Sequence, residues 1–242
     1  MVLAAEQILL GKADAMIVGG AEAPLHLPLL AQFESSGVLG FHEDARQTCR
    51  PFDASRNGLV LGEGSAFLIL ESARTAAARG AEGLARLTGW ACGVDDFNRV
   101  GVREDGARLL QIMQQALHLA GLEAGQLDYI NTHGTGTVDN DLAEACAITR
   151  LLGHRAELLP CSSTKPVTGH CLGATPALEA VLCIEALRRQ QVPPTANFSQ
   201  PDPLCPINAR AAIPPSALLA HVLSNSLGFW GYHAALIFSK AR

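Results

Sequence analysis

The sequence has 242 residues, of which 48% are hydrophobic and 17% charged, and its formal net charge at pH 7 is −5. A chain of this length and apolar content can bury a core, so it does not have the composition of a disordered protein. The mildly acidic balance, without a basic block, argues against nucleic acid or an anionic membrane as the main partner. No apolar run reaches the roughly 18 residues of a membrane span, so we expect none.

The cysteines and the first residues bear on the compartment. Seven cysteines are scattered along the chain, with no C-x-x-C pair. This spacing predicts neither a disulfide framework nor a zinc site. The first residues lack the basic stretch, apolar run and cleavage site of a secretory signal, and Glu6 and Gln7 interrupt the apolar residues there. We therefore expect a cytoplasmic protein with reduced thiols and no bound metal.

The first elements are predicted from periodicity and from residues that end helices. A helix is expected over 2–12 and a short buried strand over 15–18. Residues 23–56 have no clear period and contain several prolines and glycines, so they predict a long loop. Such a loop in a compact domain is usually functional or part of an interface. A strand over 66–70 and a short helix over 72–79 follow.

The second part of the chain is more regular. We predict strands over 84–92, 127–131, 158–162, 221–226 and 234–239, and helices over 109–120, from 139 or 141 to 152, and over 177–189. This order of strands and helices implies an α/β layered fold with a mainly parallel sheet.

Two histidines follow predicted strands in turns rich in glycine and threonine. His133 lies in the turn 131–137, and His170 ends the turn 162–170, five residues after Lys165. Parallel sheets build their sites at the carboxyl ends of strands, and glycines let a ligand approach the backbone. A lone histidine in a loop is more often structural, but two in matching turns, one with a lysine, favour a functional site.

Other candidate features are weaker. The glycine-rich turn 224–231 is either a tight turn between the last two strands or a loop that carries aromatic side chains over a pocket. There is no dinucleotide motif, P-loop or G-x-S-x-G elbow. The remaining histidines have no ligand spacing and are interpreted as structural or surface residues: His26, His42, His118, His154, His221 and His233.

Six segments taken together indicate a family. In chain order they are 49–58, 62–64, the turn with His133, the turn with Lys165 and His170, 201–203, and 224–226. This set resembles the β-ketoacyl-acyl carrier protein synthases, condensing enzymes with the thiolase fold. The resemblance runs in order over essentially the whole chain, and several separate motifs make chance agreement improbable.

The resemblance implies a decarboxylative Claisen condensation, in which a cysteine is acylated and a malonyl-carrier protein loses CO₂. It places His133 and His170 as the pair that polarises the malonyl thioester carbonyl and stabilises the enolate. Lys165 resembles the lysine that tunes this site electrostatically. No cofactor is implied beyond the phosphopantetheine arm of an acyl carrier protein, which carries the substrate.

The resemblance also implies roles in substrate binding. Thr135 and Thr137 match threonines that hydrogen-bond the phosphopantetheine arm, and Phe229 matches an aromatic gate at the acyl pocket. We also place Trp230 at this pocket. Two acidic residues that follow the histidine motif, at 141 and 144, are expected to be structural.

Several positions depart from the family pattern. Trp230 stands where the family has a glycine and adds bulk at the gate. Tyr232 and His233 replace what is usually Thr-Asn. Pro176 restrains the first turn of the helix that follows His170. These changes suggest relaxed selection on catalysis.

The nucleophilic cysteine is the main departure. In the family it lies at a strand-to-helix turn, and this chain begins within that helix, so we expect the nucleophile to be absent. Cys161 and Cys171 match packing residues and are not expected to replace it. We expect one truncated ketosynthase-like domain over 1–242 with an incomplete thiolase-like fold. Its parts are a remnant of the N-terminal half (1–80) and a complete C-terminal half (81–242).

Three hypotheses for function follow from this organisation. The first is a non-catalytic subunit resembling a chain-length factor, because a missing half would leave apolar surface that a full-length ketosynthase subunit could cover. It would form an obligate heterodimer or a higher hetero-oligomer and act with an acyl carrier protein in polyketide, polyene or fatty-acid-type elongation. The second is one half of a split synthase whose cysteine is on another chain. The third is a truncated gene product.

Overall fold

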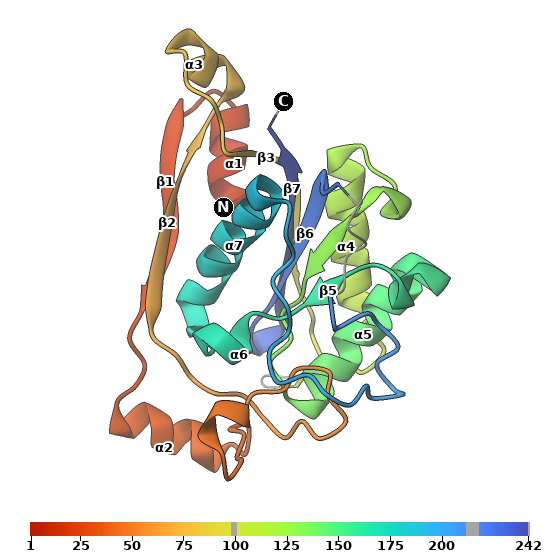
Figure 1. Cartoon of the computed structure of the whole chain (residues 1–242). Helices are drawn as coiled ribbons and strands as arrows, with labels where there is room; N and C mark the ends of the chain where they lie inside the picture. The colour runs from red at the N-terminus through yellow and green to blue at the C-terminus, as the bar shows by residue number, and fades with distance from the viewer. Residues whose placement is uncertain (98–100, 212–217, 242) are drawn as a thin grey trace.

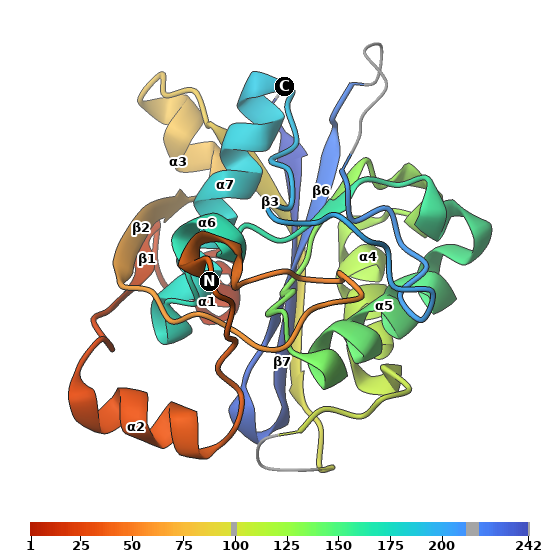
Figure 2. The ribbon, with the colours of Figure 1, turned by 60° about the horizontal axis from the view of Figure 1, so that its bottom comes forward.

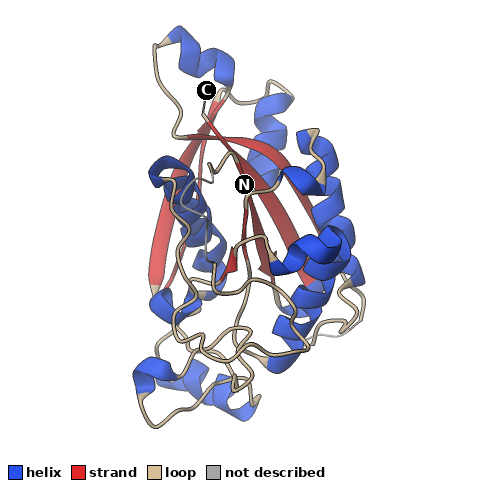
Figure 3. Cartoon of the chain, turned by 45° about the vertical axis from the view of Figure 1, so that its right-hand side comes forward, coloured by secondary structure: helices blue, strands red, loops and turns tan. Residues whose placement is uncertain are grey.

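The computed structural model describes residues 1–97, 101–211 and 218–241, and its elements form layers around a helix (Figure 1). On one side lies an antiparallel pair of strands, β1 (Ala15–Glu22) and β2 (Gly64–Glu71). The helix α7 (Thr175–Arg189) packs between this pair and a five-stranded sheet. The far face of that sheet is covered by α4 (Ala107–Ala120) and α5 (Val138–Leu152), as Figure 3 shows. The α/β layered architecture predicted from the sequence is confirmed.

The five-stranded sheet is mixed, and the expectation of a mainly parallel sheet is wrong. Its strands, in spatial order, are β3 (Ala85–Val94), β7 (Tyr232–Lys240), β6 (His221–Leu227), β4 (Tyr129–Asn131) and β5 (Cys161–Ser162). β6, β4 and β5 are parallel, whereas β7 runs antiparallel to both β6 and β3. Only residues 228–231 join β6 to β7, and a connection that short places neighbouring strands antiparallel.

Both faces of the sheet carry apolar cores. On one face α4 buries Ile112 and Met113 completely, and Gly121 ends this helix in the left-handed conformation at φ 66°. On the other face α7 contributes Cys183 and Leu187 to a second core. The predicted period of α4 and its stop at Gly121 are therefore confirmed.

The segment 23–56, expected to be a loop, contains the helix α2 (Leu27–Ser35), which Figure 2 shows set apart from the sheets. Pro28 lies in the first turn of α2, where a missing backbone N–H costs nothing. Phe33 is buried, and Leu29 and Leu30 pack beside it. Pro28 therefore marks the beginning of a helix, and the expectation of an unbroken loop is corrected.

The remaining helices are short: α1 (Val2–Leu9), α3 (Ala73–Ala78) and α6 (Lys165–Thr168). β5 is shorter than the strand expected over 158–162, because residues 153–157 form a 3₁₀ turn and pairing with β4 begins at Cys161. Among the residues that the structure describes, no helix combines the length and the apolar character that crossing a membrane would require.

Candidate active site

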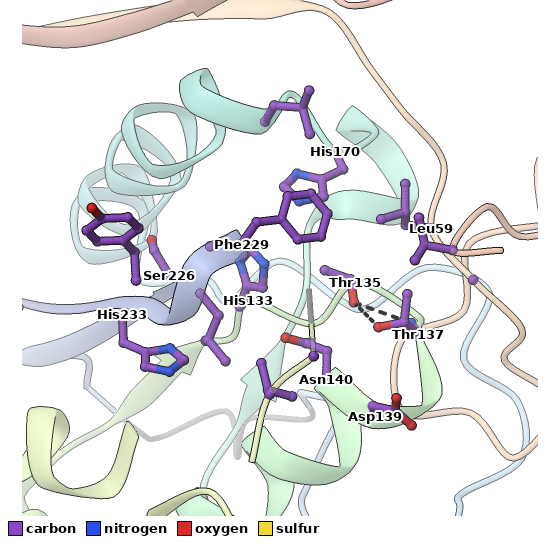
Figure 4. Close-up of a pocket in the computed structure, with 18 of the residues that line it drawn as sticks. Leu59, His133, Thr135, Thr137, Asp139, Asn140, His170, Ser226, Phe229 and His233 are labelled. Atoms are coloured by element: carbon purple, nitrogen blue, oxygen red, sulfur yellow. Dashed lines mark hydrogen bonds between the residues drawn. The ribbon is translucent and has the colours of Figure 1, made fainter. Parts of the chain in front are cut away.

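A cavity of about 900 Å³ opens beyond the carboxyl ends of β4 and β6 (Figure 4). Five of the predicted site residues line it: His133, Thr135, Thr137, His170 and Phe229. They come from three separate segments of the chain, so the fold brings the two predicted histidine turns and the aromatic turn together. This is the edge of the sheet at which α/β proteins usually build their sites.

His133 and His170 form a close pair. Their ring centroids are 5.3 Å apart and their planes make an angle of 80°. Their side chains are 5% and 9% exposed, respectively. The backbone N–H of His170 donates to the carbonyl of Val60 at 2.7 Å, and its Nδ1 lies 3.1 Å from Thr175 Oγ1. These contacts fix the second ring beside the first.

Two carboxylates of α5 hold the turn that carries His133. Glu144 Oε1 accepts a hydrogen bond from the backbone N–H of His133 at 2.8 Å, and its Oε2 accepts one from Gly134 at 2.8 Å. Asp141 Oδ1 accepts from the backbone of Thr135 at 3.0 Å and of Gly136 at 3.2 Å. Both carboxylates thus shape the turn, the structural part expected of them.

Gly134 shows why this turn needs glycine. Its φ is 34°, and a Cβ there would lie 2.7 Å from the Cβ of Ser163. Ser163 Oγ also donates to the Gly134 carbonyl at 2.6 Å. The two turns that follow β4 and β5 therefore touch where the Ser163 side chain meets the backbone of Gly134, which a larger residue at 134 would prevent.

Lys165 lies beneath the histidines rather than in the cavity. It is 1% exposed, and its Nζ donates to Glu179 Oε1 of α7 at 2.6 Å and to the carbonyl of His133. Lys165 thus ties α7 to the turn that carries His133. Glu179 was not predicted as a site residue, because its partner Lys165 is 14 residues away and reaches it only through the fold.

Burial keeps both imidazoles uncharged. Burial lowers the pKa of His170 to about 3, and the Lys165 charge acts in the same direction. Burial also lowers the pKa of His133 well below its usual value, with further contributions from Lys165, His170 and His233. At neutral pH each ring therefore carries one N–H and one free nitrogen. Two neutral N–H donors in a buried site can hold a carbonyl oxygen as negative charge develops on it.

The other predicted binding residues take different positions. Thr135 and Thr137 line the cavity with their Oγ1 atoms 2.8 Å apart. Phe229 also lines it and packs on Phe33 of α2 with ring centroids 5.9 Å apart. Trp230 is 60% exposed and is not among the lining residues. Its φ is 66°, in the left-handed region, which the glycine of the family pattern adopts without steric cost.

The cysteines divide into buried and accessible groups. Five are buried, namely Cys49, Cys161, Cys171, Cys183 and Cys205. Burial raises the pKa of Cys49 and of Cys205 to about 12, and it raises that of Cys171. Such thiols are poor nucleophiles. Cys92 is exposed and lines the cavity, a position that the sequence did not indicate.

His233, interpreted from sequence as structural or surface, also lines the cavity. It is the second residue of β7 and follows the glycine-rich turn 228–231. Its place directly after this turn, a candidate pocket loop, was the one signal in the sequence that could have indicated a site residue. Ser226, from the turn 224–231 that the sequence offered as a possible pocket loop, also lines the cavity, and Asn140 is a lining residue that the sequence did not indicate.

Family models match both parts of the chain. The model for the N-terminal domain of β-ketoacyl synthases matches residues 1–76, and the model for their C-terminal domain matches residues 84–199. The chain belongs to the β-ketoacyl synthase family. The resemblance inferred from the six sequence segments is thereby confirmed.

Curated β-ketoacyl synthase relatives are similar over nearly all of this chain. Nodulation protein E of Rhizobium sp. (strain N33) is 40% identical over 237 residues, which cover 98% of this chain and 57% of that protein. The 3-oxoacyl-[acyl-carrier-protein] synthase 2 of Staphylococcus aureus (strain COL) is 39% identical over 230 residues, which cover 95% of this chain and 56% of that protein. The chain thus spans just over half the length of these relatives.

Solved structures share the thiolase-like ketosynthase fold. A chain of the AntDE:AntF complex, a type II polyketide synthase acyl carrier protein with its ketosynthase bound to the hexaketide, has a TM-score of 0.95 and 34% identity. It is covered to 59%, and this chain to 99%. A β-ketoacyl synthase from Burkholderia phymatum STM815 has a TM-score of 0.91 and 38% identity, and the match covers 100% of this chain and 58% of that one. The ishigamide ketosynthase/chain length factor has a TM-score of 0.88 and 33% identity, and the match covers 98% of this chain and 56% of that one.

Proposed function

We propose that this chain provides the thioester-activating histidine pair of a ketosynthase assembly. In this reaction His133 and His170 donate hydrogen bonds to the carbonyl oxygen of a malonyl thioester, which is delivered on the phosphopantetheine arm of an acyl carrier protein. Loss of CO₂ then places negative charge on that oxygen, where two neutral N–H donors stabilise it. The observation that carries the proposal is the buried, uncharged pair, with ring centroids 5.3 Å apart, at the cavity.

The surroundings of the pair support the same reading. Thr135 and Thr137 stand on the cavity wall with two hydroxyls 2.8 Å apart, which suits the amide groups of a pantetheine arm. Lys165 braces the His133 carbonyl without entering the cavity. A buried lysine–glutamate pair is costly to desolvate, so its presence beneath the two rings favours a working site.

We also propose a full-length ketosynthase subunit as the partner. The outer face of the β1–β2 pair exposes three large apolar side chains, Ile17, Phe67 and Ile69, at 75%, 62% and 72%. Ile17 is the cross-strand partner of Ile69, so these side chains form one patch. Contiguous apolar surface of this kind marks an interaction site. Ketosynthase complexes among the structural neighbours support a partner of the same family.

Release of CO₂ tests the proposed chemistry. The chain is co-purified with a ketosynthase subunit whose own two site histidines are replaced by alanine, and malonyl-carrier protein is added without an acyl acceptor. We expect CO₂ release that His133→Ala lowers by about 100-fold or more, the usual effect of removing one such donor. Release that continues unchanged in His133→Ala would remove the proposal.

A second candidate is a non-catalytic subunit resembling a chain-length factor, which would shape the acyl tunnel of a catalytic partner. The observation that favours it is Trp230, a bulky residue where the ketosynthase pattern has glycine. Trp230 itself lies outside the cavity, so it would act on the tunnel through Phe229, the lining residue that it directly follows. In that case Trp230→Gly changes the length of the products made by the complex, while His133→Ala leaves the rate of condensation unaltered. The opposite pair of results supports the histidine-pair function.

A further inference from the structure

His233 is a third histidine of the cavity, at a position where the ketosynthase pattern usually has asparagine. Figure 4 shows it entering from β7, whereas His133 and His170 enter from the two glycine-rich turns. Its side chain is 4% exposed, and its backbone is fixed in the sheet between Gly93 and Leu227. The ring is therefore held in place at the wall of the site.

The ring has an unpaired nitrogen inside the protein. His233 Nδ1 is buried and has no hydrogen-bond partner among the residues that the structure describes. An unsatisfied buried polar atom costs about 1–3 kcal/mol, so such atoms are normally paired with protein or water. The mechanism proposed above does not use this nitrogen, and it requires an explanation.

A small void on the same ring supplies one. It has a volume of about 10 Å³ and is lined by His233 together with Asp95, Arg103 and Arg108. This volume is close to the minimum that holds a single water molecule, and polar as well as apolar residues line it. His233 is thus a lining residue of both the water-sized void and the main cavity.

We propose that His233 is a proton donor of this cavity, which passes a proton from the void to the bound substrate. The inference rests on the proposed function, since it needs a malonyl thioester held by His133 and His170. When the bond between the α-carbon and the carboxylate breaks, its electron pair enters the enolate and CO₂ leaves. The α-carbon then takes the proton of His233 Nε2, and Nδ1 takes one from the water in the void. Solvent restores the proton of that water, and exchange of the two ring protons with solvent then returns His233 to its starting tautomer, with the proton on Nε2.

The charges around the ring are compatible with this step. Burial lowers the pKa of His233, Asp95 at the end of β3 opposes that effect, and Arg108 of α4 adds to it. His133 faces the same cavity and is itself uncharged. A neutral imidazole has one N–H donor and one acceptor, which is what a relay between two proton sites requires.

Chemical rescue tests the inference in the same co-purified complex, with acetyl-carrier protein formation from malonyl-carrier protein as the readout. His233→Ala should slow this protonated product about 100-fold, within the range for loss of a general acid. Added imidazole should restore much of the rate, an effect that a merely structural histidine would not give. His118→Ala, on the exposed side of α4, is the matched control and should behave as wild type with and without imidazole.

A second variant covers misfolding. His233→Asn carries the residue usual in the family and should also be slow, because an amide cannot relay a proton. Rates within twofold of wild type for His233→Ala or His233→Asn, or a slow His233→Ala that imidazole does not restore, would overturn the inference. If His133→Ala is inactive and His233→Ala is not slowed, only the inference about His233 fails. If His133→Ala keeps full activity, the proposed function itself fails.

Discussion

Lys165 and Glu179 face each other inside the protein with Nζ and Oε1 2.6 Å apart, and neither lines the cavity. Lys165 also donates to the carbonyl of His133. Lys165 therefore acts on the histidine pair from outside the cavity. It holds the backbone of His133, and its charge lowers the pKa of both His133 and His170. The ion pair supports the geometry and the neutrality of the two imidazoles.

The buried ion pair predicts that the stability of the fold depends on both Lys165 and Glu179. Lys165→Met removes the partner of a buried carboxylate and should lower the free energy of unfolding by about 3–5 kcal/mol. Because burial already raises the pKa of Glu179, the unpaired carboxyl should take up a proton in this variant. The double variant Lys165→Met, Glu179→Leu should regain at least half of the loss, measured by denaturant unfolding. A double variant no more stable than Lys165→Met would show that the pair is not the source of the effect.

The buried histidines predict a pH dependence of stability. The pKa of His170 is about 3 in the folded protein and near 6.5 when exposed, so the folded state binds fewer protons between these values. Its contribution to stability is therefore full above pH 6.5 and is lost as the pH falls toward 3, by up to about 1.4 kcal/mol per pH unit. The variant His170→Asn should lack this pH-dependent contribution to stability. The stability difference between wild type and His170→Asn should thus fall between pH 6.5 and pH 4.

A matched variant makes this measurement specific. His118 is exposed on α4, so His118→Asn should track the wild-type stability curve over the same pH range. A His170→Asn curve parallel to that of wild type would mean that His170 is accessible to protons in the folded state.

The cysteines predict a pattern of alkylation. Cys92 is exposed at the cavity, and five others are buried, with the pKa of Cys49 and of Cys205 raised to about 12. Only a thiolate reacts readily with iodoacetamide, so Cys92 should be modified first in the native protein. Peptide mapping by mass spectrometry after a short exposure measures this order. Modification of Cys171 as fast as Cys92 would contradict the described burial.

The exposed apolar patch predicts how the chain associates. Ile17, Phe67 and Ile69 would remain in contact with water in a monomer. We expect the chain alone to aggregate and the co-expressed pair with a ketosynthase subunit to elute as a defined heterodimer, measured by size-exclusion chromatography with light scattering. Replacing Ile17 and Ile69 by threonine, which also favours strands, should reduce aggregation of the chain alone. A well-behaved, cooperatively melting monomer of the wild-type chain would contradict the proposed partner surface.

Local patterns in the sequence were sufficient where one element decides its own structure. The period of α4 and the glycine at 121 predict that helix and its end, and the glycine-rich turns predict where His133 and His170 stand. The motif segments then identify the family. Each element, turn or motif is a short run of neighbouring residues, and the family follows from several such runs in order.

The rest depends on contacts between distant residues. Glu179 becomes part of the site only because α7 packs beneath the turn with His133, and His233 only because β7 enters the sheet beside β3. Two other features had local signals that the period alone does not carry: the short turn 228–231 makes β7 antiparallel to β6, and Pro28 lies in the first turn of α2. None of these is visible in the period of a single segment.

The central claim is that His133 and His170 act as one unit on the thioester carbonyl, and a double-mutant cycle on CO₂ release tests it most directly. His133→Ala, His170→Ala and the double variant are compared in the complex whose partner lacks its own site histidines. Groups that act together have strongly non-additive effects. We predict that each single variant loses about 100-fold or more and that the double variant is only a little slower than either. Losses that multiply as two independent factors, or no loss at all, would contradict the account.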